Sequence, residues 1–453
     1  MQSSLRLDTT VPVLLLRTDP CPIHHGSVAI ARRLGRLGVP VYAMVEDRFT
    51  PLAVCRYVTR AFANEPMDSE GLLAEVQAIA DALRGPAILL PTDDRGAVFI
   101  AEHAQALGSR FLFPHLPAEL PRLLANKMSL YSLCRRIGMP CPEYAVPTSI
   151  NQVHEFIART RFPAVVKAGE HLHRLKNRYS SCVVETPNEL LALIRGEDFL
   201  HPSIVLQEHI PGEDWIFHGY CSPQTKCFVG FTGKKLRSYP PFAGPTTLGI
   251  SMLNDTLSQQ AEAMLKLIGF SGIVDLDFRR DERDGRYKLL DFNPRVGANF
   301  RMFEDHAGMD VVQALHLDLT GRTVKRSPMI AGRTFIVELH DLAAVVSHLR
   351  RGRMTIREWL RSFSRKCELA WWSWSDPLPF LAMVARLLLR VADRSVRTCL
   401  AQIKAYLHRP ATARWLAAFR DRAVAGRSRS KECKRATFVV EDGHGAAEQR
   451  RLP

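Results

Sequence analysis

The residues best suited to chemistry are concentrated between residues 273 and 301, in the sequence IVDLDFRRDERDGRYKLLDFNPRVGANFR. This segment predicts two strands joined by a charged turn. If the strands pair antiparallel, Asp277 lies opposite Asp291, and Asn293, two residues further on, points to the same face. Two carboxylates and an amide oxygen on one face suit Mg²⁺, a hard cation that takes oxygen ligands and shares them with phosphates.

The same alternation brings Arg295 to that face, where a guanidinium could hold a phosphoryl or carboxylate group. The predicted strands are Gly272–Phe278 and Tyr287–Phe292. A solvated hairpin with ordinary surface charges would show the same pattern, so alternation alone leaves both interpretations open.

Two lysines favour the first interpretation. Lys167 ends the apolar strand Ala164–Lys167, and Lys127 lies at the start of the predicted helix Leu124–Ile137. A lysine left unpaired at the end of a buried strand is costly. A phosphate partner would explain its presence.

A strand running into a turn, IVLQEHIPGEDW, follows downstream. Glu208 and the backbone near His209 and Ile210 could bind the edge of an adenine ring. Glu213 or Asp214 could accept hydrogen bonds from ribose hydroxyls, and the ambiguous length of the turn leaves both open.

The elements that must position these residues begin with an open α/β unit. Apolar strands are predicted at Val11–Leu16, Val41–Val45 and Ala87–Leu90, with an amphipathic helix at Val28–Leu37. The first turn has too few glycines for a dinucleotide-binding fingerprint. In open sheets of this kind, ligands gather at the carboxyl ends of the strands.

Polar residues do follow two of those strand ends. Asp94 could face the cleft and hold an amine, or it could cap the helix that begins at Arg95, and the second interpretation is slightly favoured. His24 and His25 lie in the first turn, where histidines are more often exposed to solvent than catalytic.

The +15 net charge belongs to one end of the chain. Residues 322–453 hold 27 of the 61 Lys and Arg but 11 of the 46 Asp and Glu. Within them Pro379–Arg397 predicts a helix with an apolar stripe and an arginine stripe, which suits either the surface of an anionic membrane or packing on the body of the protein. Nucleic acid is disfavoured, because aromatic residues are not interleaved with the basic ones.

The ten cysteines form no CxxC pair, and no secretory signal or spanning segment is apparent. We therefore expect a cytoplasmic protein with reduced thiols. If the protein attaches to a membrane, we expect it to bind peripherally, at the inner face.

Lys127, Lys167, QEHIPGED, LDF and LLDFNPR occur in the order typical of ATP-grasp enzymes, which the chain resembles over roughly residues 10–321. GKKLRSYPP and NFRMFEDHAGMDVVQALHLDLTG, with a weaker echo in WSWSDPLPFL, make it most similar to the carboxylate–amine ligases related to D-aspartate ligase. The resemblance implies an α/β chain in four parts. These are an open α/β domain preceding the ATP-grasp domain (1–118), the ATP-grasp domain (119–321), a basic helical region (322–423) and a disordered tail (424–453).

The resemblance also implies a role for each residue of the site. It implies that Lys127 and Lys167 contact the phosphates of ATP, that Glu208, His209 and Ile210 contact adenine, and that Glu213 or Asp214 contacts the ribose.

For catalysis, it implies that Asp277, Asp291 and Asn293 ligate Mg²⁺ (or Mn²⁺) and that Arg295 stabilises the transferred phosphoryl group. Lys235 and Arg237 would lie over the phosphates or the carboxylate substrate.

One stretch departs from the family pattern. Many ATP-grasp proteins have a glycine-rich loop over the phosphates after the second lysine. Here that stretch, AGEHLHRLKNRYSSCV, has one glycine and five basic side chains, namely His171, His173, Arg174, Lys176 and Arg178. It is a candidate lid that supplies charge by side chain, or else a merely mobile basic loop.

The implied reaction joins a small-molecule carboxylate to an amine through an acyl phosphate, with release of ADP and phosphate. Two alternatives remain at this point. The first is a carboxylase that uses bicarbonate, although no biotin-carrier segment is apparent. The second is a binding or membrane-associated protein that keeps the ATP-grasp fold and acts through its basic C-terminal helices.

Overall fold

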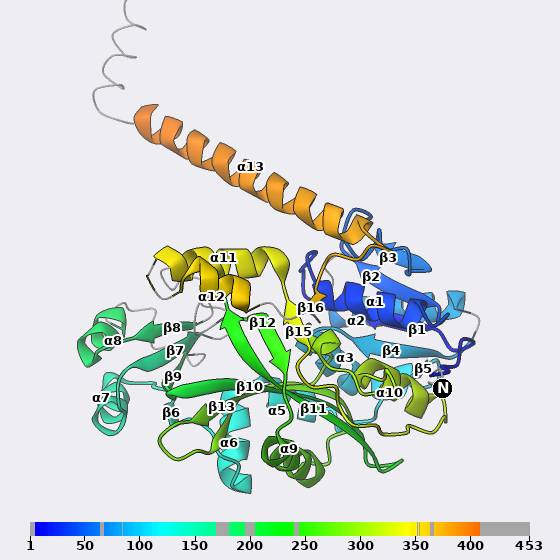
Figure 1. Ribbon diagram of the computed structural model, residues 1–453, viewed down its shortest axis with the longest axis horizontal. Helices are drawn as coiled ribbons and strands as arrows, with labels where there is room; N and C mark the ends of the chain where they lie inside the picture. The colour runs from blue at the N-terminus through cyan, green and yellow to red at the C-terminus, as the bar shows by residue number, and fades with distance from the viewer. Residues whose placement is uncertain are drawn as a thin grey trace, which may run out of the picture. The chain divides into compact units, whose positions relative to one another are not determined.

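The computed structural model describes residues 5–63, 68–83, 85–168, 181–194, 204–239, 244–350, 352, 354–362 and 367–407. The chain divides into two compact units, Met1–Met383 and Val384–Pro453. The described part of the first unit is built on three sheets (Figure 1).

The first sheet is parallel throughout. Its order is β3 (Arg60–Ala63), β2 (Val41–Val45), β1 (Val13–Leu16), β4 (Ala87–Pro91) and β5 (Phe111–Leu112). Every residue of β1 is buried, as expected of a parallel strand covered on both faces. The helices of this part are α1 (His25–Gly35), α2 (Ser69–Ala82), α3 (Asp94–Glu102) and α4 (Ala104–Leu107).

Two short helices lead into the second sheet. Asn126 is extended and its side chain accepts hydrogen bonds from Met128 and Ser129, so the predicted helix is divided into α5 (Leu120–Ala125) and α6 (Lys127–Ile137). Lys127 is thereby the first residue of α6. Gly138 ends α6 in the left-handed conformation, which confirms the predicted stop.

The second sheet is antiparallel and has four strands. Their order is β6 (Tyr144–Ala145), β9 (Ile204–Glu208), β7 (Ala164–Ala168) and β8 (Ser181–Val184). Helices α7 (Ile150–Arg159) and α8 (Pro187–Ile194) pack against it through a separate small core that includes Val153, Phe156 and Leu190 (Figure 1).

The third sheet is the largest. Its order is β14 (Tyr287–Asn293), β13 (Gly272–Asp281), β10 (Gly212–Ser222), β11 (Cys227–Ser238), β12 (Thr246–Ser251), β15 (Thr334–Ile336) and β16 (Cys367–Leu369). Only the β15–β16 pair is parallel among these neighbours. The helical elements that accompany it are α9 (Asp255–Leu267), η2 (Phe300–Met302), α10 (Val311–Leu319), α11 (Glu338–Arg350) and α12 (Ile356–Arg361).

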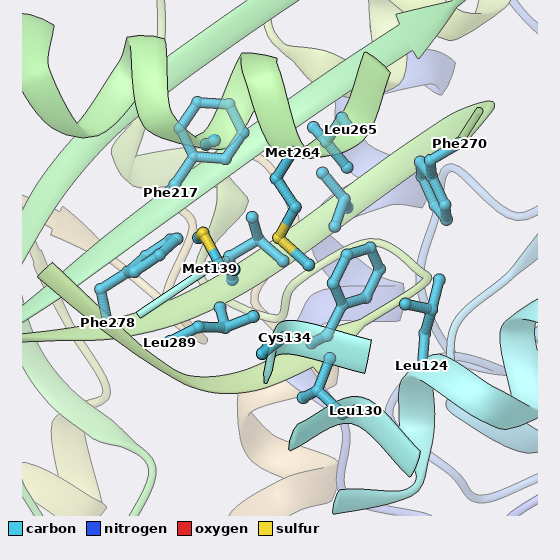
Figure 2. Close-up of a cluster of buried hydrophobic side chains, with 14 of the residues drawn as sticks. Leu124, Leu130, Cys134, Met139, Phe217, Met264, Leu265, Phe270, Phe278 and Leu289 are labelled. Carbon is cyan, nitrogen blue, oxygen red and sulfur yellow. The ribbon is translucent and has the colours of Figure 1, made fainter. Parts of the chain in front are cut away.

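The large sheet has one apolar face and one polar face. Figure 2 shows the apolar side, where Phe217, Phe278 and Leu289 of the sheet meet Met264 of α9 and Cys134 of α6. Because side chains alternate along a strand, the intervening residues of β10, β13 and β14 point to the opposite face. That face carries the polar residues described below.

The region after Gly321 differs from the expected separate helical region. Strands β15 and β16 complete the large sheet, and Trp371 is buried. Arg32 of α1 donates to the side chain and backbone carbonyl of Asp376, and both residues are buried. These strands, of three residues each, show too little periodicity to be recognised in the sequence.

The final helix is α13 (Leu378–Leu407), which contains the predicted helix Pro379–Arg397. Within the described residues, no helix combines the length and the apolar character needed to cross a membrane. The predicted tail at 424–453 lies outside the described residues.

Candidate functional site

The polar face of β13 and β14 has the predicted register. Asp277 pairs with Asp291 across the two strands, and Asp275 pairs with Asn293. Asn293 donates through its amide nitrogen to the backbone oxygen of Asp275, at 3.1 Å. The strand pairing inferred from alternation is therefore confirmed, and it brings together the three expected oxygen ligands.

Each of the two predicted acidic ligands is paired with a lysine. Lys127 Nζ lies 2.5 Å from Asp291 Oδ1, and Lys235 Nζ lies 2.7 Å from Asp277 Oδ2. The first lysine begins α6 and the second projects from β11. Among the described residues, no group of three or more His, Cys, Asp or Glu side chains is arranged to hold a metal ion by itself.

Lys167, at the end of β7 in the four-stranded sheet, faces the same group of charges. Burial, followed by the charge of Lys127, lowers the pKa of Lys167 to about 7, although Asp291 and Asp277 act in the opposite direction. The ammonium therefore lacks sufficient compensation from the residues around it. An anion between the two sheets would supply that compensation.

The acidic groups respond to the same charges. Burial would raise the pKa of Asp291, but Lys127 and Lys167 outweigh it and the pKa is lowered. Burial raises the pKa of Asp277, and Lys235 only partly offsets this increase. The site is thus a set of strongly interacting charges in which lysines occupy the space beside both carboxylates.

Asp275 is a third carboxylate on this face, and the sequence interpretation missed its role. Its Oδ2 accepts from Arg295 Nη1 at 3.0 Å, and its Oδ1 lies 2.8 Å from His218 Nε2. Burial opposes ionisation, but His218 and Arg295 lower the pKa of Asp275 overall. Gly297 must be glycine here, because a Cβ would lie 2.2 Å from the His218 ring and 2.6 Å from Asp275. The signal was present in the sequence, since Asp275 alternates with Asp277.

The predicted adenine segment lies at the junction of β9 and β10. Glu208 is buried, and its carboxylate accepts from Arg283 at 2.5 Å. The Ile210 carbonyl accepts from Arg279 at 3.1 Å. His209 is half-buried, and burial lowers its pKa. The Glu208 side chain is therefore already paired with Arg283. An adenine ring would have to be contacted by the backbone of this segment and not by that side chain.

The two candidates for the ribose contact separate in the structure. Asp214 pairs across strands with Arg279 and lies on the same face as Asp277. Glu213 is exposed and pairs with Lys234 at 2.6 Å. Only Asp214 shares the face of the charged cluster.

Arg237 does not join Lys235 at the site. A β-bulge at Leu236 shifts the register, so that Lys235 pairs with Gly249 while Arg237 pairs with the adjacent residue Leu248. Arg237 instead donates through its Nε and Nη2 to the carboxylate of Asp341 on α11 at 2.8 and 2.9 Å. The resemblance implied a position over the phosphates or the carboxylate substrate, whereas in the structure this guanidinium is engaged in a buried ion pair.

Asp94 of the first domain does not cap a helix, and its side chain lies near Arg295 of the charged cluster. Asp93 is the N-cap of α3 and accepts from the Gly96 amide at 2.6 Å. Asp94 begins the helix, with its Oδ1 lying 3.4 Å from Arg295 Nε. His24 caps α1, and burial lowers its pKa well below the ordinary value. The predictions that Asp94 caps the helix and that His24 is exposed to solvent are therefore wrong.

The basic loop that was considered as a lid, residues 169–181, lies outside the described residues except for Ser181, which begins β8.

No protein-family model matches the chain. D-aspartate ligase of Enterococcus faecium is 25% identical over 228 residues, which cover 46% of this chain and 53% of the relative. The match thus spans about half the length of that curated relative.

Solved structures show the same fold. N5-carboxyaminoimidazole ribonucleotide synthetase, in an ADP complex, superposes with a TM-score of 0.57 at 12% identity, covering 77% of this chain and 86% of that one. L-amino acid ligase from Bacillus licheniformis gives 0.53 at 17% identity, covering 69% and 75%. These likenesses show that the chain has the ATP-grasp fold.

Proposed function

We propose that this protein is an ATP-dependent ligase that joins a carboxylate to an amine and releases ADP and phosphate. The observation that carries the proposal is the meeting of Lys127, Lys167 and Lys235 with Asp277 and Asp291 on facing sheets. A purely structural role would not require three lysines to converge where their charges repel one another. The names of the relatives, D-aspartate ligase and L-amino acid ligase, support the same reaction class.

The nucleotide would lie between the four-stranded and the seven-stranded sheets. Lys127 and Lys167 would contact its phosphates, and the backbone from Glu208 to Ile210 would contact adenine. Of the two ribose candidates we favour Asp214, because it lies on the face of the charged cluster. The ADP complex of a neighbour with this fold supports nucleotide binding at such a site.

The residues present fit a hard divalent cation. Asp277, Asp291 and Asn293 can each offer an oxygen atom, and the two carboxylates are paired with the ammonium groups of Lys235 and Lys127. We infer that these three residues hold Mg²⁺, with Mn²⁺ as an alternative, jointly with the phosphates. When bound, such an ion supplies charge neutralisation along the phosphate chain.

The chemistry then follows from the charges. A carboxylate is a poor electrophile, so its oxygen first attacks the γ-phosphorus, ADP leaves, and an acyl phosphate forms. Repulsion between the two anions is the obstacle, and Lys235 and Arg295 are placed to offset it. An amine next attacks the acyl carbon, the phosphate leaves with the bonding electrons, and the nitrogen loses a proton.

The test is a measurement of ADP release from the full chain with MgATP. D-aspartate, other D- and L-amino acids, and bicarbonate would be supplied in turn, with and without ammonium chloride or glycinamide. We expect ADP release that requires a carboxylate and an amide product that requires both substrates. ADP release with bicarbonate alone would favour a carboxylase. Release that is indifferent to every carboxylate would contradict the proposal.

A second proposal concerns location. Leu388 and Leu389 of α13 are 65% and 69% exposed, and Arg390 beside them is exposed as well. Exposed leucines next to arginines on one long helix match an interfacial helix on anionic lipid. We propose that α13 binds an anionic membrane surface and leaves the ligase chemistry to the first unit.

A further inference from the structure

Asp94 lies at the edge of the first sheet where ligands of such sheets bind, at the carboxyl end of β4. Its neighbour Asp93 is saturated with hydrogen bonds. Asp93 Oδ2 accepts from the amides of Thr18 and Asp19 at 2.7 and 2.8 Å, and its Oδ1 accepts from Gly96 and from the Thr18 hydroxyl. Asp93 therefore fixes the loop after β1 to the start of α3, and it frees Asp94 from any capping duty.

The Asp94 carboxylate is both accessible and unsaturated. Its Oδ1 is covered yet accepts no hydrogen bond within the described part of the chain, and the side chain as a whole is 40% exposed. A carboxylate oxygen without a hydrogen-bond donor, at the strand end where ligands of such sheets bind, indicates a place for a ligand that is cationic or donates a hydrogen bond.

Arg295 connects this place to the nucleotide side of the site. Its Nη1 is on Asp275, and its Nε faces Asp94 at 3.4 Å. A group that is bound by Asp94 would therefore lie beside the guanidinium assigned to the transferred phosphoryl group. This is where the nucleophile of the second step must be delivered.

Building on the proposed ligase function, we propose that Asp94 binds the amino group of the acceptor substrate, which is a primary amine that arrives as an ammonium ion. The carboxylate attracts the ammonium, takes its first proton and so leaves a neutral amine, whose lone pair attacks the acyl carbon. The phosphate leaves with the bonding electrons of the C–O bond and takes up the second proton that the nitrogen loses. Asp94 then returns the proton to water, so that charge and protons balance over the cycle. Burial raises the pKa of Asp94 to about 6, which suits a group that must bind a cation and still accept a proton.

The experiment separates the two chemical steps. Hydroxylamine is neutral near pH 7.5 and traps acyl phosphates as hydroxamates, so it reports activation without needing an ammonium site. In Asp94→Asn we expect amide formation with glycinamide or ammonium chloride to fall by about 100-fold, with a raised KM for the amine. Hydroxamate formation and carboxylate-dependent ADP release should stay within about threefold of the wild type, since neither needs that proton acceptor.

Two controls define the interpretation. Asp94→Glu keeps a carboxylate and should recover part of the amide formation. Asp81→Asn removes an exposed carboxylate that pairs with Arg110 on the surface, and it should change neither reaction.

An equal loss of hydroxamate and amide in Asp94→Asn would show that Asp94 acts on activation through Arg295, and an unchanged KM for the amine would show that it binds no amine. Either result overturns the inference while the ligase function stands. If the wild type itself releases no ADP in response to any carboxylate, the proposed function fails first and this inference falls with it.

Discussion

Lys235 and Arg237 are two positions apart on β11, yet Lys235 pairs with Asp277 on β13 and Arg237 pairs with Asp341 on α11. The bulge between them separates a residue of the charged cluster from a residue that holds the fold together. Lys235 meets Asp277, whereas Arg237 is buried against Asp341 and also donates to the Ser362 hydroxyl at 2.8 Å. Substitutions at the two positions should therefore have different consequences.

Arg237→Ala should lower the free energy of unfolding by about 3–5 kcal/mol, because it leaves the Asp341 carboxylate buried without its partner. Lys235→Ala should cost less stability, because its pair with Asp277 is less deeply buried than the Arg237–Asp341 pair, while ADP release is strongly reduced. Denaturant unfolding and ADP-release assays on both variants check this. A stable Arg237→Ala protein that has lost only ligation would restore Arg237 to the active site.

Asp291→Ala should reduce carboxylate-dependent ADP release by about 100-fold or more and leave the chain folded. The reason is the loss of an oxygen ligand and of the carboxylate that positions Lys127. Circular dichroism and ADP release are the measurements, with Asp284→Ala in the exposed turn between β13 and β14 as the matched control. Near-normal turnover by a folded Asp291→Ala protein would contradict the metal assignment.

Nucleotide binding should be accompanied by proton uptake at Lys167. The pKa of about 7 in the nucleotide-free chain means that Lys167 is largely neutral at pH 8, and phosphates raise the pKa again by stabilising the ammonium. Uptake should approach one proton at pH 8 and vanish well below pH 7, where Lys167 is already charged. Titration calorimetry of ADP in buffers of different ionisation enthalpy measures it. In Lys167→Arg, which is always charged, the contribution of this residue should disappear.

Binding to lipid should depend on the exposed leucines of α13. Leu388→Glu combined with Leu389→Glu should reduce co-sedimentation with phosphatidylglycerol vesicles and spare ADP release. Leu342→Glu, at an exposed leucine of α11, is the matched control. Equal sedimentation of both variants, or wild-type binding that is no stronger to phosphatidylglycerol than to phosphatidylcholine, would remove the membrane proposal.

The central strand pairing could be predicted because alternation in IVDLDF and LLDFNP is regular, so Asp277, Asp291 and Asn293 were expected on one face. The role of Arg237 was expected from the resemblance of its segment, and a motif does not reveal the register shift between Lys235 and Arg237 or the partner on α11. The sequence alone also does not distinguish Asp93 from Asp94 as the cap of α3, because both are good caps and only the position of the loop after β1 decides between them. The contribution of residues 334–383 to the body depends on contacts with α1 that are remote in sequence.

The contact between Arg32 and Asp376 spans 344 positions of the chain. During synthesis at about 5–20 residues per second, the first sheet, which ends with β5 at Leu112, would be complete about 13–53 s before residue 376 is made. Throughout that interval Arg32 lacks the acceptors that the described residues give it, which are the Trp371 carbonyl and the side chain and carbonyl of Asp376. The first domain of the nascent chain therefore reaches its full stability only after the segment with Trp371 and Asp376 has been made. Premature termination before residue 376 would leave Arg32 as a buried cation without its carboxylate partner.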